Sequence, residues 1–354
     1  MDNQQYDAIL VLSFGGPEGM DDVIPFLENV LRGRNVPRAR LEEVSHHYKL
    51  FDGVSPINAQ NRALIAALRK ELEANGPNLP IYFGNRNWHP LLPDTFQQMA
   101  GDGVQRVLAF FTSMFSSYSG CRQYRENLYT AQQSLASPEM ITVDKIRMAY
   151  NHPGFIEPNV DHVRYALHEI PADRRANAHI AFTAHSIPTA MAKNSRYEEQ
   201  LQESSRLVVE GLRAEGVAFD QWQLVYQSRS GAPHMPWLEP DICDHLEILH
   251  GQGVRDVVLS PIGFISDHME VIYDLDTEAR EVADKLGLNM VRASSVGTHP
   301  KFVRMIRDLI VERMTIGAER VAIGRFGPNH DVCPVNCCLS GRPSPPLPSL
   351  AQRG

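Results

Sequence analysis

The 354-residue sequence contains no long hydrophobic run. Its clean apolar stretches, such as Ala8–Leu12 and Val107–Phe111, are short, whereas a membrane-spanning helix needs about 20 consecutive apolar residues. The first residues, Met1–Gln5, lack the basic segment and the apolar core of a signal peptide. The sequence therefore predicts a cytoplasmic protein without an integral membrane span.

Positive charge is also in deficit. The chain has 34 Lys and Arg residues against 42 Asp and Glu residues, which gives a formal net charge of −8. Nucleic-acid-binding proteins usually carry the opposite sign, because they neutralise phosphates, so nucleic acid is not an expected partner. Hydrophobic residues make up 43% and charged residues 21%, which is ordinary for a globular protein and argues against a largely disordered chain.

Cysteine is scarce and unevenly placed. There are five cysteines, an odd number, and Cys333, Cys337 and Cys338 lie close together near the end of the chain. This is not the pattern of a secreted disulfide framework. Bunched thiolates in a reducing compartment favour soft-metal or iron–sulfur ligation. The simpler alternative is three solvent-exposed thiols.

Short apolar segments alternate with longer amphipathic segments along the chain. Segment 58–74, for example, carries Leu64, Leu68 and Leu72 at helical spacing. The predicted strands are Tyr6–Ser13, Leu79–Gly84, Arg106–Phe111, His179–Ala184, Gln223–Gln227, Asp256–Pro261 and Asn289–Ala293. This alternation predicts an α/β fold with parallel strands and crossover helices.

The two halves of the chain resemble each other. Gly-Asp-Gly-Val-Gln-Arg-Val-Leu at 101–108 is echoed 150 positions later by Gly-Gln-Gly-Val-Arg-Asp-Val-Val at 251–258. Either an α/β unit is duplicated, or this pattern is a common helix–strand turn. Duplication predicts two doubly wound lobes, residues 1–150 and 151–325, facing a cleft at the carboxyl ends of their strands. Residues 326–354 are then a cysteine-containing extension with a disordered, proline-rich tail.

Residues that follow the predicted strands are candidates for chemistry, because ligands bind at the carboxyl ends of parallel strands. Ser13-Phe14-Gly15-Gly16-Pro17 looks like a weak phosphate loop, but the acids that follow would repel a phosphate, so a tight turn is the better interpretation. His185 follows an apolar strand where a catalytic base would lie, although a single histidine there is as often structural. Ser186 beside it does not indicate a hydrolase, because no Gly-x-Ser-x-Gly motif occurs.

An acidic row follows the strand predicted at Asp256–Pro261. Glu270, Asp274 and Glu278 are spaced by four residues, which places them along one face of a regular helix. A solvated acidic face is the simple alternative. Carboxylates that lead inward from a strand end also suit the passage of a hard or borderline cation. Repulsion between like charges, together with burial, should raise the pKa of the innermost acid and fit it to accept protons.

Five motifs stand in order along residues 6–315. They are Ser13-Phe14-Gly15-Gly16-Pro17, Gly53-Val54-Ser55-Pro56, Ala184-His185-Ser186-Ile187-Pro188, Pro236-Trp237-Leu238-Glu239-Pro240-Asp241 and Gly263-Phe264-Ile265-Ser266-Asp267-His268-Met269-Glu270. Together they make the chain similar to the ferrochelatases, which insert ferrous iron into a porphyrin. It most resembles the soluble bacterial branch that acts on coproporphyrin III. The resemblance implies two Rossmann-like lobes around a porphyrin cleft.

The resemblance also implies roles for the residues that follow the strands. His185 corresponds to the metal-binding and proton-accepting histidine, and Glu270 to its partner glutamate. Asp274 and Glu278 correspond to outer acids that guide the metal. The chemistry fits, because metallation must exchange pyrrole protons for a divalent cation, and a histidine that faces a carboxylate can accept protons and hold ferrous iron.

Other matching positions are implied to hold the macrocycle and its propionates. They are Arg32, Tyr48, Ser55 and Tyr124. Two positions depart from the family. Phe14 stands where some members have a tyrosine that reaches the iron, and phenylalanine cannot ligate. His47 stands where another basic porphyrin contact is found, so a propionate contact there would depend on pH.

The sequence therefore predicts an enzyme that inserts ferrous iron into coproporphyrin III. A protoporphyrin IX ferrochelatase is the nearest alternative, although residues 33–60 contain no long apolar insertion of the kind that gives such enzymes a membrane-facing lip. A cobalt chelatase and a non-catalytic haem- or metal-binding module are weaker alternatives. Porphyrin and ferrous iron are the expected small-molecule partners, and other haem-pathway enzymes are candidate protein partners.

Several ferrochelatases resemble this chain in having crowded C-terminal cysteines, which hold a two-iron two-sulfur cluster together with one internal cysteine. The resemblance implies such a cluster on Cys333, Cys337 and Cys338. The internal position falls on Pro158, so the fourth ligand must come from elsewhere. Cys121, in a loop expected to line the cleft, is the candidate. Cys243 lies in a predicted helix and fits a small core residue.

Overall fold

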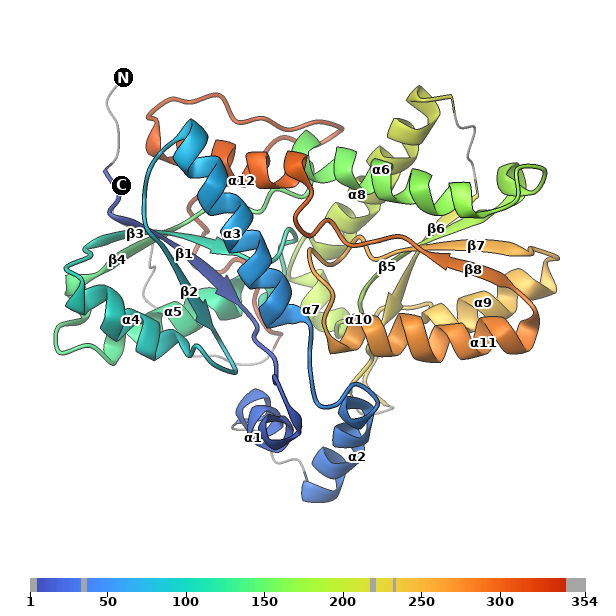
Figure 1. Ribbon diagram of the computed structural model, residues 1–354, viewed down its shortest axis with the longest axis horizontal. Coiled ribbons are helices and arrows are strands. Elements are labelled where there is room, and N and C mark those ends of the chain that lie inside the picture. Colours follow the sequence, from blue (N-terminus) through green and yellow to red (C-terminus); the bar gives the residue numbers. More distant parts are fainter. Residues whose placement is uncertain (1–4, 33–36, 217–220, 232–233, 342–354) are drawn as a thin grey trace.

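Two parallel four-stranded sheets form the centre of the structure, which is a computed structural model describing residues 5–32, 37–216, 221–231 and 234–341 (Figure 1). The first sheet has the strand order β2 (Ile81–Asn85), β1 (Ala8–Ser13), β3 (Arg106–Phe111) and β4 (Thr142–Lys145). The second has the order β6 (Trp222–Gln227), β5 (His179–His185), β7 (Asp256–Ser260) and β8 (Asn289–Arg292). Neighbouring strands are parallel and the two orders match, as duplication of an α/β unit predicts.

All seven predicted strands are present, and their ends differ from the predicted ends by at most two residues. The helix predicted over residues 58–74 is α3 (Ile57–Asn75). The sequence pattern does not predict β4, because Thr-Val-Asp-Lys is short and largely polar. This strand pairs with β3 at the edge of the first sheet, where a half-buried strand needs few apolar residues.

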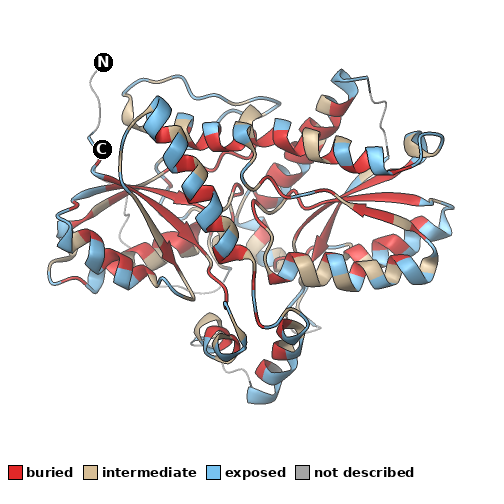
Figure 2. Cartoon of the chain, viewed as in Figure 1, coloured by how far each residue is buried: buried red, intermediate tan, exposed pale blue. Residues whose placement is uncertain are grey.

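Strand β1 shows why the apolar runs are nearly continuous. Ile9 and Val11 face one hydrophobic core, whereas Leu10 and Leu12 face another, because successive side chains of a strand point to opposite faces. Both faces are therefore buried, as is typical of parallel sheets covered by helices (Figure 2).

Helices cover both faces of the two sheets. One face of the first sheet packs on α4 (Leu92–Gly101) and α5 (Gln123–Gln133), and one face of the second packs on α9 (Ile242–Gly251) and α11 (Ala279–Leu286). The opposite faces share a single core with α3, α6 (Pro153–Glu169), α8 (Tyr197–Ala214) and α12 (Pro300–Met314). The two lobes thus have one common core, and the domain boundary near residue 150 stays a prediction. No helix in the described ranges has the length and apolar character to span a membrane.

Two helices project beyond the sheets, α1 (Met20–Val30) and α2 (Arg38–Lys49) (Figure 1). They bury a small cluster of their own that includes Phe26, Tyr48 and Met269. Because Met269 begins α10 (Met269–Tyr273) in the second half of the chain, this cluster ties the projecting helices to both lobes.

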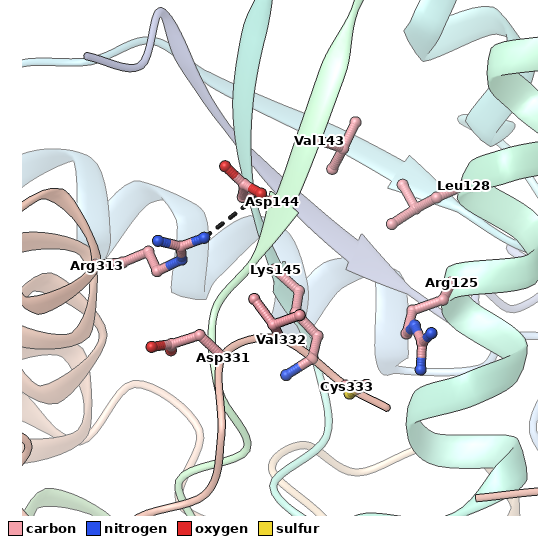
Figure 3. Close-up of a pocket in the computed structure, with 9 residues that line it drawn as sticks. All are labelled: Arg125, Leu128, Val143, Asp144, Lys145, Arg313, Asp331, Val332 and Cys333. Carbon is pink, nitrogen blue, oxygen red and sulfur yellow. Dashed lines mark ion pairs between the residues drawn. The ribbon is translucent and has the colours of Figure 1, made fainter. Parts of the chain in front are cut away.

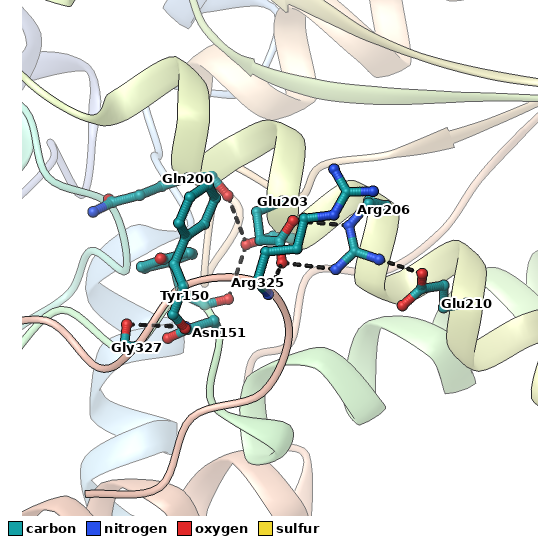
Figure 4. A network of polar contacts seen from close by, with 10 residues as sticks. Tyr150, Asn151, Gln200, Glu203, Arg206, Glu210, Arg325 and Gly327 are labelled. Carbon is teal, nitrogen blue, oxygen red and sulfur yellow. Dashed lines mark hydrogen bonds and ion pairs between the residues drawn. The ribbon is translucent and has the colours of Figure 1, made fainter.

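After α12 the chain returns across the molecule as residues 315–341, here named the C-terminal strap. Asn151 Nδ2 donates a hydrogen bond to the Phe326 carbonyl oxygen at 2.8 Å. It also donates one to the Gly327 carbonyl oxygen at 3.3 Å, and Glu203 accepts one from the Arg325 backbone N–H at 2.7 Å (Figure 4). Glu203 is itself paired with Arg206 on α8. These contacts hold the strap against α8 and against the segment that begins the second lobe. The predicted proline-rich tail, residues 342–354, lies outside the described residues.

Candidate active site

His185 is the last residue of β5, and local contacts orient its ring. Nδ1 lies within hydrogen-bond distance of the Ser186 carbonyl oxygen, and the Tyr197 hydroxyl donates a hydrogen bond to the His185 carbonyl oxygen at 3.1 Å. Since a carbonyl oxygen can only accept, Nδ1 carries the hydrogen in this contact. Nε2 is then the nitrogen available for a proton or a metal, and it lies 3.5 Å from Oε1 of Glu270.

Glu270 reaches this position because the loop after β7 packs closely on β5. A Cβ atom at Gly263 would lie 2.6 Å from the Ala184 Cβ, so only glycine allows this approach. Glu270 then lies in the first turn of α10, where Gln227 Nε2 donates to its carbonyl oxygen at 2.8 Å. The Glu270 carboxylate therefore faces His185 from a fixed backbone.

His268 is a third member of the site that the sequence analysis did not single out. Its Nδ1 caps α10 by accepting from the Glu270 backbone N–H at 3.2 Å, and it lies 3.7 Å from Glu270 Oε2. Burial lowers the pKa of His268. Glu270 thus stands between two imidazoles. In the sequence, the only signal for His268 is its place two positions before Glu270 in the same motif.

The charges of His185 and Glu270 stabilise each other. Burial alone would lower the pKa of His185, but the charge and hydrogen bond of Glu270 outweigh it and raise the pKa to about 9. Burial alone would raise the pKa of Glu270, but His185 lowers it to about 2. The expectation that the innermost acid of the row has a raised pKa is therefore wrong for Glu270, because the charge and hydrogen bond of His185, aided by His268, outweigh its burial.

The acid with the strongly raised pKa is Asp274. Burial, aided by the charges of Glu270 and Glu278, raises its pKa to about 7 despite a hydrogen bond from Ser228 Oγ. Burial and the charge of Asp241 also raise the pKa of Glu278. At neutral pH Asp274 can therefore exchange a proton, whereas Glu270 remains a fixed negative charge.

The four-residue spacing of the acidic row predicts a regular α-helix, but the structure does not have one there. Residues Asp274–Glu278 form a π-helical turn between α10 and α11. A π-turn changes the rotation per residue, so the four-residue spacing does not give a straight stripe. The charges of Glu270 and Glu278 still act on Asp274, so the three carboxylates remain neighbours. Such turns are frequent at functional sites.

Helix α2 brings two of the predicted porphyrin contacts beside this group. The Tyr48 ring is buried, and burial together with the charge of Glu270 raises its pKa. The His47 ring stacks on Tyr273 with centroids 4.0 Å apart and an interplanar angle of 7°. Ser55 is also buried, and a Cβ atom at Gly16 would lie 2.7 Å from its Cβ.

Phe14 and Tyr124 are connected by Arg86, which the sequence analysis missed. The Arg86 guanidinium lies 4.6 Å from the Tyr124 ring centroid and 5.5 Å from that of Phe14. Arg86 follows β2, a strand end to which no motif points. Arg32 is exposed just beyond the end of α1 and donates to Asn29 Oδ1 in the last turn of that helix at 2.5 Å. The structure thus groups His185, Glu270, Asp274 and Tyr48, while Arg32 and Tyr124 contact other neighbours.

Four cysteines come together away from this site. Cys121, in the π-helical turn Tyr118–Arg122, is hydrogen-bonded to Cys333, and the Cys337 and Cys338 Sγ atoms are 3.4 Å apart. Hydrogen bonds from Cys121 and Cys337 hold the pKa of Cys333 below its usual range. Cys243 lies elsewhere, on α9.

Cationic side chains lie near these cysteines, and the nearby acids Asp144 and Asp331 are paired with arginines. Arg125 and Lys145 line a pocket beside Cys333 (Figure 3), and the buried Arg125 Nη1 has no hydrogen-bond partner among the described residues. Arg122 Nη1 donates to the Val335 and Cys337 carbonyl oxygens at 2.6 and 3.2 Å. Thiolates that bind a metal carry negative charge, which such cations would balance. The donor set therefore fits an iron–sulfur cluster.

An imidazole against a carboxylate at the ends of the adjacent strands β5 and β7 of a two-lobed α/β fold, with an acidic row beside it, is the arrangement of a metal chelatase. A family model described as Ferrochelatase matches residues 6–314, and the chain belongs to that family. This confirms the resemblance on which the sequence analysis relied.

Curated relatives match over nearly the whole chain. The coproporphyrin III ferrochelatase of Streptomyces coelicolor is 54% identical over 98% of this chain and 96% of the relative. The ferrochelatase of Rhodopirellula baltica is 55% identical over 97% and 96%, respectively. Among solved structures, SirB from Bacillus subtilis with Fe3+ has a TM-score of 0.51 at 12% identity, covering 88% of this chain and 96% of that one. This last match supports the fold alone.

Proposed function

We propose that this protein inserts ferrous iron into coproporphyrin III. The observation that carries the proposal is His185 Nε2 at 3.5 Å from Glu270 Oε1, in a chain of the ferrochelatase family. Relatives from Streptomyces coelicolor, Streptomyces griseus and Frankia alni carry the name coproporphyrin III ferrochelatase at 50 to 54% identity, which favours this porphyrin over protoporphyrin IX. A cytoplasmic location and partners from the haem pathway stay predictions.

In the proposed reaction, two pyrrole protons leave the ring as one ferrous ion enters, so the total charge is conserved. His185 Nε2 accepts a proton in its neutral form, and the fixed charge of Glu270 stabilises the imidazolium that results. Asp274, with a pKa of about 7, is the neighbouring acid that can take up and release protons at neutral pH. Imidazole and carboxylate are also suitable ligands for the incoming ferrous iron.

The choice of porphyrin is testable by comparing two substrates. Coproporphyrin III has four propionates and protoporphyrin IX has two, so the former offers more anionic groups to basic residues such as Arg32 and Arg86. We expect a higher kcat/KM for coproporphyrin III, measured by anaerobic absorption spectroscopy with ferrous iron. Arg86→Gln should narrow the difference. Equal values for the two porphyrins in the wild type would contradict the proposed substrate.

The acidic row is proposed to conduct iron toward His185. Asp274→Asn and Glu278→Gln should each raise the apparent KM for ferrous iron more than they lower kcat, because a neutral side chain binds a cation less well. Since Asp274 is largely protonated below its pKa of about 7, the wild-type KM for iron should fall as the pH rises through 7. Asp274→Asn should weaken this dependence. A change in kcat alone would argue against conduction.

We also propose that Cys333, Cys337 and Cys338 hold a two-iron two-sulfur cluster, for which the sequence names Cys121 as one candidate for the fourth ligand. Such a cluster would supply a one-electron redox centre that links the strap to the turn preceding α5. Protein purified without oxygen should be reddish-brown and contain iron and sulfide, and Cys337→Ser should lose its visible absorption bands. Cys243→Ser is the matched control and should keep them. A colourless wild-type protein without sulfide would remove the cluster and leave the chelatase proposal intact.

A further inference from the structure

The strap places a histidine among the clustered thiols. The ligand atoms of His330, Cys333 and Cys337 all lie within 4.8 Å of one another, and His330 Nε2 is 3.9 Å from Cys337 Sγ. Bonds of about 2.0 Å to nitrogen and about 2.3 Å to sulfur place tetrahedral ligand atoms roughly 3.5 Å apart. Each iron of a two-iron two-sulfur cluster takes two protein ligands besides the two sulfides. His330 Nε2 and Cys337 Sγ, 3.9 Å apart, are therefore already close to the spacing of a ligand pair on one iron.

Backbone contacts fix the loop that carries these donors. Lys145 Nζ donates to the His330 carbonyl oxygen at 3.1 Å, and the Cys337 backbone N–H donates to the Pro334 carbonyl oxygen at 3.0 Å. Arg122 holds the carbonyl oxygen of Cys337. Because all of these bonds use backbone oxygens or nitrogens of the loop, they leave its imidazole and thiol groups available for a ligand.

Five donors compete for the four ligand positions that the proposed cluster requires. Cys121 is 2% exposed and shares the hydrophobic core of the first lobe with Cys333, but it lies on the turn before α5, outside the loop that carries the other donors. His330 is within reach of both Cys333 and Cys337 and lies on the same loop as they do. A ligand set from residues 330–338 alone would close the site within one short segment, at little cost in chain entropy.

We propose that His330 is a nitrogen ligand of this metal centre, in a set with Cys333, Cys337 and Cys338, and that Cys121 is not a ligand. This inference rests on the cluster proposed above and not on the chelatase reaction. An imidazole in place of one thiolate makes the centre one charge less negative. Since His330 is the exposed member of the group, it also forms the side of the centre that meets solvent.

The test uses the full chain, purified without oxygen, with 15N-labelled histidine. Iron and sulfide are quantified, and the dithionite-reduced protein is examined by pulsed electron paramagnetic resonance. We expect a strong nitrogen hyperfine coupling that is absent in His330→Ala and His330→Cys. His330→Cys should retain iron and sulfide, because it supplies a thiolate at the same place. Cys121→Ser should retain the metal and the coupling, as should the matched control His250→Ala on the exposed end of α9.

Each other outcome has a distinct meaning. A cluster without nitrogen coupling, or with coupling that survives in His330→Ala, overturns the assignment of His330 alone. Loss of the cluster in Cys121→Ser overturns the proposed ligand set. A wild-type protein that contains zinc without sulfide, and loses the zinc in His330→Ala, supports His330 as a ligand and removes the cluster. A metal-free wild type overturns both the assignment of His330 and the cluster. Iron insertion by the same preparation then leaves the chelatase proposal standing.

Discussion

His185→Ala should reduce iron insertion by at least about 100-fold while leaving porphyrin binding within about tenfold, or ~1.4 kcal/mol. The substitution removes both the proposed proton acceptor and a metal ligand, whereas the macrocycle contacts proposed for α2 and the loop at Ser55 remain. The measurement is anaerobic insertion of ferrous iron into coproporphyrin III, together with porphyrin binding followed by fluorescence quenching.

Folding has to be controlled in this experiment, because His185 ends a buried strand. The variant loses the charge pair with Glu270, so its thermal unfolding is measured beside that of the wild type. His250→Ala, on the exposed end of α9, is the control for loss of a histidine and should insert iron normally. A folded His185→Ala protein with activity close to that of the wild type would exclude His185 from the reaction.

Local patterns in the sequence predict the scaffold well. The run His179–Ala184 is apolar enough to be a buried strand, and the residue after a parallel strand lies at the ligand-binding edge of its sheet. His185 follows from these two facts. Glu270 is reached in the same way from the strand that ends near Ser260. Both positions depend only on the chain within about ten residues, where periodicity is informative.

Contacts between distant segments could not be predicted in this way. Arg86 lies between the Phe14 and Tyr124 rings, which come from segments 110 residues apart, and no motif marks it. The strap brings His330 and Cys333 to Lys145 and Cys121 of the first lobe, which are about 190 to 210 positions earlier in the sequence. The π-turn at Asp274 could not be predicted from the sequence either, because the same kinds of side chain occur in π-turns and in α-helices.

The pKa values in the site could likewise be predicted only in part from the sequence. Spacing alone suggests that Glu270, Asp274 and Glu278 repel one another, so that the innermost acid should bind a proton. The structure adds His185, whose charge and hydrogen bond outweigh the burial of Glu270 and reverse the direction of its pKa shift. The strongly raised pKa belongs to Asp274, where burial and the charges of Glu270 and Glu278 outweigh the opposing effect of His185.

Glu270→Gln should lower kcat strongly and move the pH profile of kcat/KM. In the wild type the charge of Glu270 stabilises the imidazolium and raises the pKa of His185 to about 9, so the neutral, proton-accepting form increases as the pH rises toward 9. Without that charge, burial lowers the pKa of His185, and the neutral form is already present at lower pH. The rising limb of the profile should therefore shift to lower pH, while its plateau falls because the imidazolium is no longer stabilised.

The profiles are measured without oxygen between about pH 6 and 10, since kcat/KM reports the ionisations of the free enzyme. Asp274→Asn is the matched control: it also removes one carboxylate, but Asp274 acts more weakly on His185 than Glu270 does, so its rising limb should move less. The same inflection in the wild type and in Glu270→Gln would mean that His185 is not the group whose ionisation limits the rate. Equal shifts in both variants would mean that the row acts as one diffuse charge, and that the 3.5 Å contact between His185 and Glu270 has no special role.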